Sequence, residues 1–180
     1  GAALSGYRLT DLRARLYPGP GEAPESFAVF HNLDRLMVTI KTGPADIVVG
    51  RQPIAWGSAR IVNPTDLLAP FAFNELDKEE RTGVDALRVR VPLSAMGELD
   101  FGLVAGDRLK AETSAFFLRG KIQALGTDVS AVAMGFRNNL LLGLDLARSI
   151  GGAGAWFEAA YVAPDALAPG PARGEKEQDE

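Results

Sequence analysis

The stretch Asp85-Ala86-Leu87-Arg88-Val89-Arg90-Val91-Pro92-Leu93 carries the pattern that decides the fold. From Leu87 onward the odd-numbered positions hold aliphatic side chains, whereas Ala86, Arg88 and Arg90 occupy even-numbered ones. Alternation with a period of two residues places the two sets on opposite faces of a β-strand. The stretch therefore predicts an amphipathic strand with one apolar face and one basic face.

Eight further segments show the same alternation. Most of the predicted strands are about 9–11 residues long, which is the length that a tilted strand needs to cross a bilayer. At Gly50-Arg51 the alternation falters, and we expect a β-bulge there. The eight segments are residues 8–17, 32–42, 46–56, 99–105, 114–124, 129–137, 140–148 and 154–162.

The connections between these segments differ in length in a regular way. Short turns follow the second, fourth, sixth and eighth segments, whereas residues 18–31, 57–84 and 106–113 form longer connections; Asn138-Asn139 is a short exception. Short turns at one end and long loops at the other are typical of an outer-membrane barrel. We therefore predict an all-β, up-and-down antiparallel transmembrane β-barrel.

The barrel expected from this chain is incomplete. Residues 1–162 supply about nine strands of its wall, with a long surface loop at 57–84, and residues 163–180 form a polar, disordered tail. An odd number of strands leaves an edge, so we expect the chain to be part of a larger barrel. A soluble β-sandwich or lipocalin-like barrel also alternates, but a polar face rich in arginine and glycine suits a wet lumen better.

Composition excludes several classes of protein. The 180 residues carry a net charge of −4 and no cysteine, which argues against nucleic-acid binding and excludes disulfides and thiolate metal sites. His31 is the only histidine, so no histidine triad or multi-histidine metal site can form. An acidic cluster at Glu75, Asp77, Glu79 and Glu80 fits a solvated loop helix over residues 65–81 better than a cation site. We expect no metal, no cofactor and no enzymatic activity.

Two motifs give the chain a resemblance to a known class. Gly50-Arg51-Gln52-Pro53-Ile54-Ala55-Trp56-Gly57 is followed by Asn63-Pro64-Thr65-Asp66-Leu67, and Gly83-Val84-Asp85 restarts the strand pattern. This resembles Gram-negative outer-membrane porin-like proteins with a "GRQ…WG…NPxD" element, over roughly residues 32–162. The resemblance implies a bacterial outer-membrane location and a strand that rises into a long surface loop.

The alternation assigns side chains to two faces. Nine basic and five acidic residues fall on the inward face, which favours a modest anion preference, although mutual bracing of the wall is the simpler role. The predicted lumen-lining residues are Arg13, Arg15, Arg35, Lys41, Arg88, Arg90, Arg119, Lys121, Arg137, Asp145 and Glu158, with Asp11, Asp46 and Asp100 as further inward acids. The predicted lipid-facing residues are Leu87, Val89, Val91, Phe101, Leu142, Leu144, Leu146 and Phe157.

Three local hypotheses follow. A symmetric Ser149–Ala153 turn pairs Asp145 with Glu158, and Arg119 and Lys121 reach them across a strand whose inward residues are small: Ala131, Ala133 and Gly135. The apolar run over residues 67–73 folds back onto the barrel mouth or into the lumen. Trp56 suits an interfacial girdle, and Trp156, on the face of Glu158, lines the lumen.

The function that these features predict is passive passage of small hydrophilic, preferentially anionic, solutes through a porin-like channel. The partners are outer-membrane lipid and the solute; no nucleic acid is expected, and a homo-oligomer is left open. A structural or assembly barrel that holds a partner protein or an electron carrier is the alternative. An outer-membrane enzyme is less favoured, because no nucleophile–base pair is visible.

Overall fold

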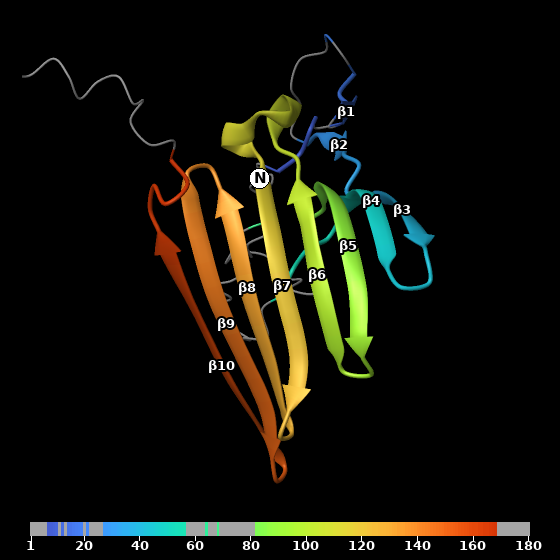
Figure 1. The fold of residues 1–180 in the computed structure, drawn as a ribbon. Helices are drawn as coiled ribbons and strands as arrows, with labels where there is room; N and C mark the ends of the chain where they lie inside the picture. The colour runs from blue at the N-terminus through green and yellow to red at the C-terminus, as the bar shows by residue number, and fades with distance from the viewer. Residues whose placement is uncertain are drawn as a thin grey trace, which may run out of the picture.

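The computed structural model describes residues 7–10, 12, 14–19, 21, 27–56, 64, 68 and 82–168. These residues confirm an all-β, antiparallel architecture, in which eight strands follow one another in chain order across one sheet (Figure 1). No helix in this part of the chain is long and apolar enough to span a membrane. The strands of the sheet are β3 (Leu36–Lys41), β4 (Asp46–Gln52), β5 (Val84–Ser94), β6 (Gly97–Val104), β7 (Ala115–Ala124), β8 (Thr127–Phe136), β9 (Asn139–Ile150) and β10 (Ala153–Ala163).

The large sheet is open in the described part of the chain. Its order runs from β3 to β10, so these two strands form its edges and no closed barrel is present among the described strands. Two short 3-10 helices, η1 (Asp107–Leu109) and η2 (Ala111–Thr113), lie in the β6–β7 connection. The eight strands correspond one to one with the last eight predicted segments.

The prediction for the first segment, residues 8–17, is wrong. Only β1 (Ala14–Tyr17) is a strand, and it pairs with β2 (Val29–His31) in a separate two-stranded sheet. Residues 7–10 are held at the start of β5 instead, because Asp85 N donates to Tyr7 O (3.1 Å) and Leu9 N donates to the Asp85 carboxylate (2.8 Å). This segment therefore cannot lie beside β3 as a further strand of the wall.

The two ends of the sheet carry different kinds of connection, as predicted. In Figure 1 the tight turns β3–β4, β5–β6, β7–β8 and β9–β10 all lie at the lower end. Strands β4 and β6 end, and β5 and β7 begin, at the upper end, and the connections between them are longer; the β8–β9 turn at Arg137-Asn138 is the expected short exception. Arg137 has a positive φ of 52°, which suits a turn residue rather than a strand residue.

Cross-strand pairing defines two faces of the large sheet. We call the face that carries Arg88, Asp100, Arg119 and Asp145 the inner face, and the opposite one the outer face. Pairs such as Val89–Phe101 and Leu146–Phe157 place apolar residues together on the outer face. All eight residues predicted to face lipid lie on this outer face: Leu87, Val89, Val91, Phe101, Leu142, Leu144, Leu146 and Phe157.

The predicted orientation of β8 is wrong. Arg119 pairs with Val132 and Phe117 pairs with Met134, so Val132 and Met134 lie on the inner face. Ala131 and Ala133 consequently lie on the outer face. The strand has no large charged residue at its centre to mark its polar side. The polar residues at even positions near its start, Asp128 and Ser130, are the signal that would have identified the inner face.

The hydrophobic core lies against the upper part of the inner face. Ile54, Trp56 and Leu68 pack there with strand residues that include Phe117 and Met134. Leu68, which is 1% exposed, is the described residue of the apolar run 67–73, and its burial agrees with the predicted fold-back. The other residues of that run, the acidic cluster and nearly all of the predicted loop helix at 65–81 lie outside the described residues.

Gly50 brings β3 and β4 close together without the predicted bulge. The β3–β4 and β4–β5 pairings run through Gly50 without a shift in register. Its φ of 119° favours glycine, and a Cβ at this position would lie 2.3 Å from the Leu36 carbonyl oxygen. Strand β4 ends at Gln52 because Pro53, which follows, has no N–H to donate to a neighbouring strand.

The chain continues in contact with the sheet after β10. Leu167 N donates to Asn138 O (2.8 Å), and Asp165 N donates to Asn139 Oδ1 (3.1 Å). Residues 164–168 therefore lie over the β8–β9 turn rather than beginning a free tail at residue 163. The remainder of the predicted tail, residues 169–180, lies outside the described residues.

Candidate functional site

A row of alternating charges crosses the inner face. Cross-strand pairing connects Lys41, Asp46, Arg90, Asp100 and Arg119, one residue from each of β3 to β7. Directly opposed residues have Cβ atoms about 5 Å apart, so each charge has an opposite charge as its neighbour. Asp46 Oδ2 lies 3.6 Å from Arg90 Nη2. We call these five residues the charge row.

Asp100 is the buried residue of the charge row. Its carboxylate is 0% exposed and accepts from Arg88 Nε (2.9 Å), Arg88 Nη2 (2.6 Å) and Trp56 Nε1 (3.0 Å). A carboxylate removed from water is tolerated only when charge and hydrogen bonds compensate it. The two bonds from Arg88 and the indole N–H provide this compensation.

Trp56 is buried against the inner face, so the prediction of an interfacial girdle position is wrong. The indole is 9% exposed and packs on Phe117 with ring centroids 4.6 Å apart and a tilt of 59°. The chain passes from β4 onto the inner face after Gln52, where Asp100 offers an acceptor for the indole N–H. A buried indole N–H generally needs such a partner.

A second row of polar residues lies nearer the short turns. Pairing connects Glu98, Lys121, Ser130, Asp145 and Glu158 across β6 to β10. The predicted pairing of Asp145 with Glu158 is thereby confirmed. Arg119, from the neighbouring charge row, donates to Ser130 Oγ from Nη2 (3.0 Å) and Nε (3.3 Å).

The proposed reason for the cluster needs correction. Ala131, Ala133 and Gly135 do not make room for Arg119 and Lys121, because these small residues belong to the outer face. Ser130 occupies the intervening position instead. It accepts from Arg119 on one side and is the cross-strand partner of Asp145 on the other. The Ser130 hydroxyl therefore lies between the basic side chain of Arg119 and the acidic side chain of Asp145.

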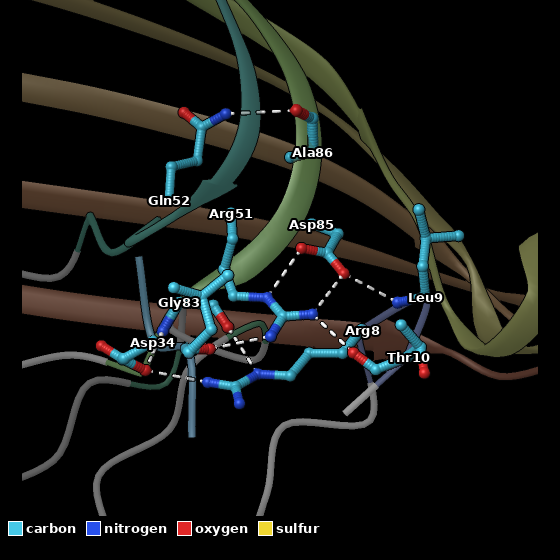
Figure 2. A network of polar contacts seen from close by, with 10 residues as sticks. Arg8, Leu9, Thr10, Asp34, Arg51, Gln52, Gly83, Asp85 and Ala86 are labelled. Atoms are coloured by element: carbon cyan, nitrogen blue, oxygen red, sulfur yellow. Dashed lines mark hydrogen bonds and ion pairs between the residues drawn. The ribbon is translucent and has the colours of Figure 1, made fainter. Parts of the chain in front are cut away.

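A separate ion-pair network holds the upper end of the sheet together (Figure 2). Arg51 donates to both oxygens of Asp85, from Nε (2.8 Å) and Nη2 (2.8 Å). The same guanidinium donates to Leu33 O (2.8 Å) and Thr10 O (2.6 Å). One side chain from the end of β4 thus joins β5, the segment before β3 and the N-terminal segment.

Arg8 extends this network to the start of β5. It donates from Nη2 to Asp34 Oδ1 (2.8 Å) and from Nε to Gly83 O (2.9 Å), and Gly83 N also donates to Asp34 Oδ1 (3.1 Å). A Cβ on Gly83 would lie 2.1 Å from the Asp34 carbonyl oxygen, so only glycine fits this approach. Burial raises the pKa of nearby Tyr7, and the charge of Arg137 opposes this shift.

The residues of both motifs therefore have structural roles that pattern analysis did not assign. Gly50 permits the close approach of β3, Arg51 binds Asp85, and Gln52 Nε2 donates to Ala86 O (3.2 Å) and Val48 O (3.3 Å). In the sequence, each motif places a glycine within two residues of a charged residue: Gly50-Arg51-Gln52 and Gly83-Val84-Asp85. Neither motif alone identified its partner.

The predicted inward residues divide into three groups. Lys41, Arg88, Arg90, Arg119, Lys121, Asp145 and Glu158 lie on the inner face. Arg15 lies in β1, Arg35 precedes β3 and Arg137 lies in a turn, so these three lie outside the strands of the large sheet, and their predicted place in a lumen stays a prediction. Arg13 and Asp11 lie outside the described residues.

The charge balance of the inner face changes accordingly. Glu98 and Asp128 also lie on this face, although the sequence analysis did not count them. Within the strands of the large sheet, the inner face carries five basic residues (Lys41, Arg88, Arg90, Arg119, Lys121) and six acidic ones (Asp46, Glu98, Asp100, Asp128, Asp145, Glu158). The basic excess that favoured anions is absent from this face.

Chemistry that requires clustered metal ligands has no support in the described residues. They contain no group of three or more histidine, cysteine, aspartate or glutamate side chains that could hold a metal ion. His31 lies in β2, away from the large sheet. The inner face instead carries ion pairs across neighbouring strands, Arg88–Asp100 and Arg90–Asp46.

Comparisons of this chain with protein-family models, with curated proteins and with solved structures found no match. The resemblance of residues 50–57 and 63–67 to porin-like proteins thus remains an expectation from the sequence. The difference between the two faces of the sheet is the feature that bears on function.

Proposed function

We propose that this chain forms part of the wall of an outer-membrane β-barrel that lets small hydrophilic solutes pass passively. The observation that carries this proposal is the sidedness of the sheet. Its inner face holds paired charges and buried polar groups. Its outer face is apolar yet exposed along the middle of the strands, with Arg51 and Asp85 at its upper end and Arg148 near the short turns. In a water-soluble sheet the apolar face is normally the covered one.

The exposed outer face extends across the whole sheet. Leu103 is 60% exposed, Leu118 51% and Leu142 49%, and they come from three different strands. Contiguous exposed apolar surface of more than a few hundred Å² marks a site of contact with lipid or protein. Lipid contact explains a face that reaches from Ile40 on β3 to Phe157 on β10.

The lengths of the strands support the same proposal. Strands β7 to β10 have 10, 10, 12 and 11 residues, and β5 has 11. A strand tilted by about 45° needs about 9–11 residues to cross the hydrocarbon core. Strands β3, β4 and β6 are shorter, with 6, 7 and 8 residues, and β4 ends before Pro53.

The stagger of the strands fits a tilted barrel wall. The charge row begins at Lys41, the last residue of β3, and continues through successive cross-strand partners to Ala160 of β10. Ala160 is seven residues beyond the first residue of β10, and seven strand steps separate β3 from β10. One residue of stagger per strand corresponds to a tilt of about 35°, given a rise of about 3.3 Å and a spacing of about 4.8 Å. Transmembrane barrels have strand tilts of about 35–45°.

The charge balance of the inner face bears on the solute. Five basic and six acidic groups give no basic excess, so we propose hydrophilic solutes without a strong anion preference. In planar bilayers under a KCl gradient, the expected reversal potential therefore lies near zero. A strongly anion-selective current would contradict this part of the proposal.

Cell fractionation and conductance together test the proposal. The protein, expressed with a secretion signal in a Gram-negative host, should remain in the outer-membrane fraction after a urea wash and should form ohmic channels in planar bilayers. Recovery as a soluble periplasmic protein would reject the membrane wall. Stable insertion without conductance would reject the channel and favour a structural barrel that holds a partner.

A further inference from the structure

A hollow on the inner face, near the short turns, has the composition of a small-molecule site. It measures about 390 Å³, and its lining includes Gln123, Asp128, Ala147, Ser149 and Trp156. Ligand sites combine aromatic or apolar walls with a few polar groups that fix orientation. We infer that this hollow binds the pyranose ring of a neutral carbohydrate, an inference that rests on the proposed channel function and names a class of solute.

Cross-strand register places the lining residues in one line. Gln123, Asp128, Ala147 and Trp156 are successive partners on β7, β8, β9 and β10. Asp128 and Trp156 are therefore two strand spacings apart, roughly 10 Å. Ala147 lies between them, so its small side chain leaves the gap open. A single pyranose ring, in its chair form, fits above Ala147, with a polar wall on one side and an indole on the other.

The floor of the hollow is made of small residues. Gly126 and Gly154 line it together with Ser149, and Gly154 has open space where a Cβ would stand. Trp156 is 48% exposed, so its ring is accessible from the hollow. In contrast, the other tryptophan of the chain, Trp56, is buried and bonded to Asp100.

The polar wall has the acceptors and donors that hydroxyl groups need. Gln123 Nε2 donates to Asp128 Oδ1 at 3.2 Å, which fixes the two side chains relative to each other. The amide oxygen of Gln123 and the second carboxylate oxygen of Asp128 are acceptors that vicinal hydroxyls can bond. The apolar C–H face of a pyranose can then lie on the indole, a large amphipathic surface.

The surrounding charges favour a neutral ligand. Arg148 also lines the hollow and would repel an organic cation. Lys121, the partner of Ser130, is a diagonal neighbour of Asp128 at about 7–8 Å and adds to this repulsion. Asp128 itself would repel an anion. A second hollow of about 530 Å³ shares Gln123 and Asp128 and also contains Glu98, Arg119 and Lys121. Two adjoining hollows leave room for a disaccharide.

Calorimetric titration of the detergent-solubilised protein with lactose tests the inference. We expect saturable binding, weakened about tenfold or more by Trp156→Ala or Asp128→Asn, since a hydrogen bond to a charged group contributes about 1.5–3 kcal/mol. Ala147→Leu fills the gap while it keeps every polar group, and should abolish binding. Phe157→Ala is the matched control, because it removes the neighbouring aromatic residue on the outer face and should leave lactose binding unchanged.

Three results would overturn the inference: no lactose binding by the wild-type protein, equal binding by Ala147→Leu, or tighter binding of choline or glucuronate than of lactose. Circular dichroism establishes that each variant is folded. Channel conductance is measured separately on the same preparations. Conductance without lactose binding rejects only the carbohydrate site, and lactose binding without conductance rejects only the channel.

Discussion

Asp145 of β9 and Glu158 of β10 are direct cross-strand partners on the inner face of the sheet. Two carboxylates at this spacing repel each other, so the fold has to offset an unfavourable interaction there. Asp145 is 8% exposed and faces Ser130, whose hydroxyl accepts from Arg119. The neighbouring basic groups Arg119 and Lys121 thus lie on the side of Asp145 away from Glu158.

The first prediction concerns this acidic pair. Replacing Asp145 by Asn and Glu158 by Gln together removes two acidic charges from the row that also holds Lys121 but keeps the shapes of both side chains. If the cluster braces the wall, the temperature of unfolding in detergent falls and the reversal potential in a KCl gradient is unchanged. If it lines the solute path, the reversal potential moves toward anion selectivity. A double variant that changes neither quantity would show that the cluster has no role.

The second prediction concerns the outer face. Leu144→Arg should lower the free energy of unfolding from lipid vesicles by about 2–4 kcal/mol, because it places a charge near the bilayer midplane. Val89→Arg should have a similar effect. Ala153→Arg, at the first residue of β10, is the control and should cost about 0–1 kcal/mol, the range for positions near the interface. Equal costs at the centre and at the end of the strands would contradict lipid contact.

The third prediction concerns the upper ion-pair network. Arg51→Met leaves Asp85 without its bidentate partner, and we expect a loss of about 3–5 kcal/mol in urea unfolding, as for other broken buried pairs. Arg90→Met is the matched control, because the Arg90–Asp46 pair is longer (3.6 Å) and about one third exposed. Its expected cost is about 0–1 kcal/mol. Similar losses for both variants would show that burial of the Arg51–Asp85 pair adds nothing.

The fourth prediction concerns the long β4–β5 connection. Leu68 belongs with Trp56 to the core cluster against the inner face. We therefore expect the connection that carries it to narrow any path beside that face. Deletion of residues 67–76 should therefore raise single-channel conductance in planar bilayers. The measurement is informative only for a protein that still inserts, which vesicle flotation establishes. Unchanged conductance in such a protein would reject a constricting role for this segment.

Much of the local architecture could be predicted from alternation alone. Leu87, Val89 and Val91 identify the outer face of β5, and Leu142, Leu144 and Leu146 do so for β9. The short Ser149–Ala153 turn fixes the partner of every residue in β9 and β10, which is why the Asp145–Glu158 pair was predictable. The period of two and the length of a turn are local properties, so the sequence states them directly.

Where the local pattern was ambiguous, prediction failed. The centre of β8 alternates small with medium-sized apolar residues, so its faces were exchanged: only pairing with Arg119 and Asp145 on its neighbours decides them. Residues 8–17 alternate convincingly, yet two hydrogen bonds with Asp85 hold residues 7–9 at the start of β5. A long-range contact overrode a local preference in both places.

By itself, the sequence determined the strands, their antiparallel order, the ends that carry short turns and the apolar composition of the outer face. These depend on side-chain periodicity and turn length, which act over a few residues. Only the tertiary structure decided that Arg51 pairs with Asp85, that Trp56 donates to Asp100, and that Gln123, Asp128, Ala147 and Trp156 lie in one row. Such contacts join residues far apart in the chain. They depend on the register of several strands at once, and no single segment contains that information.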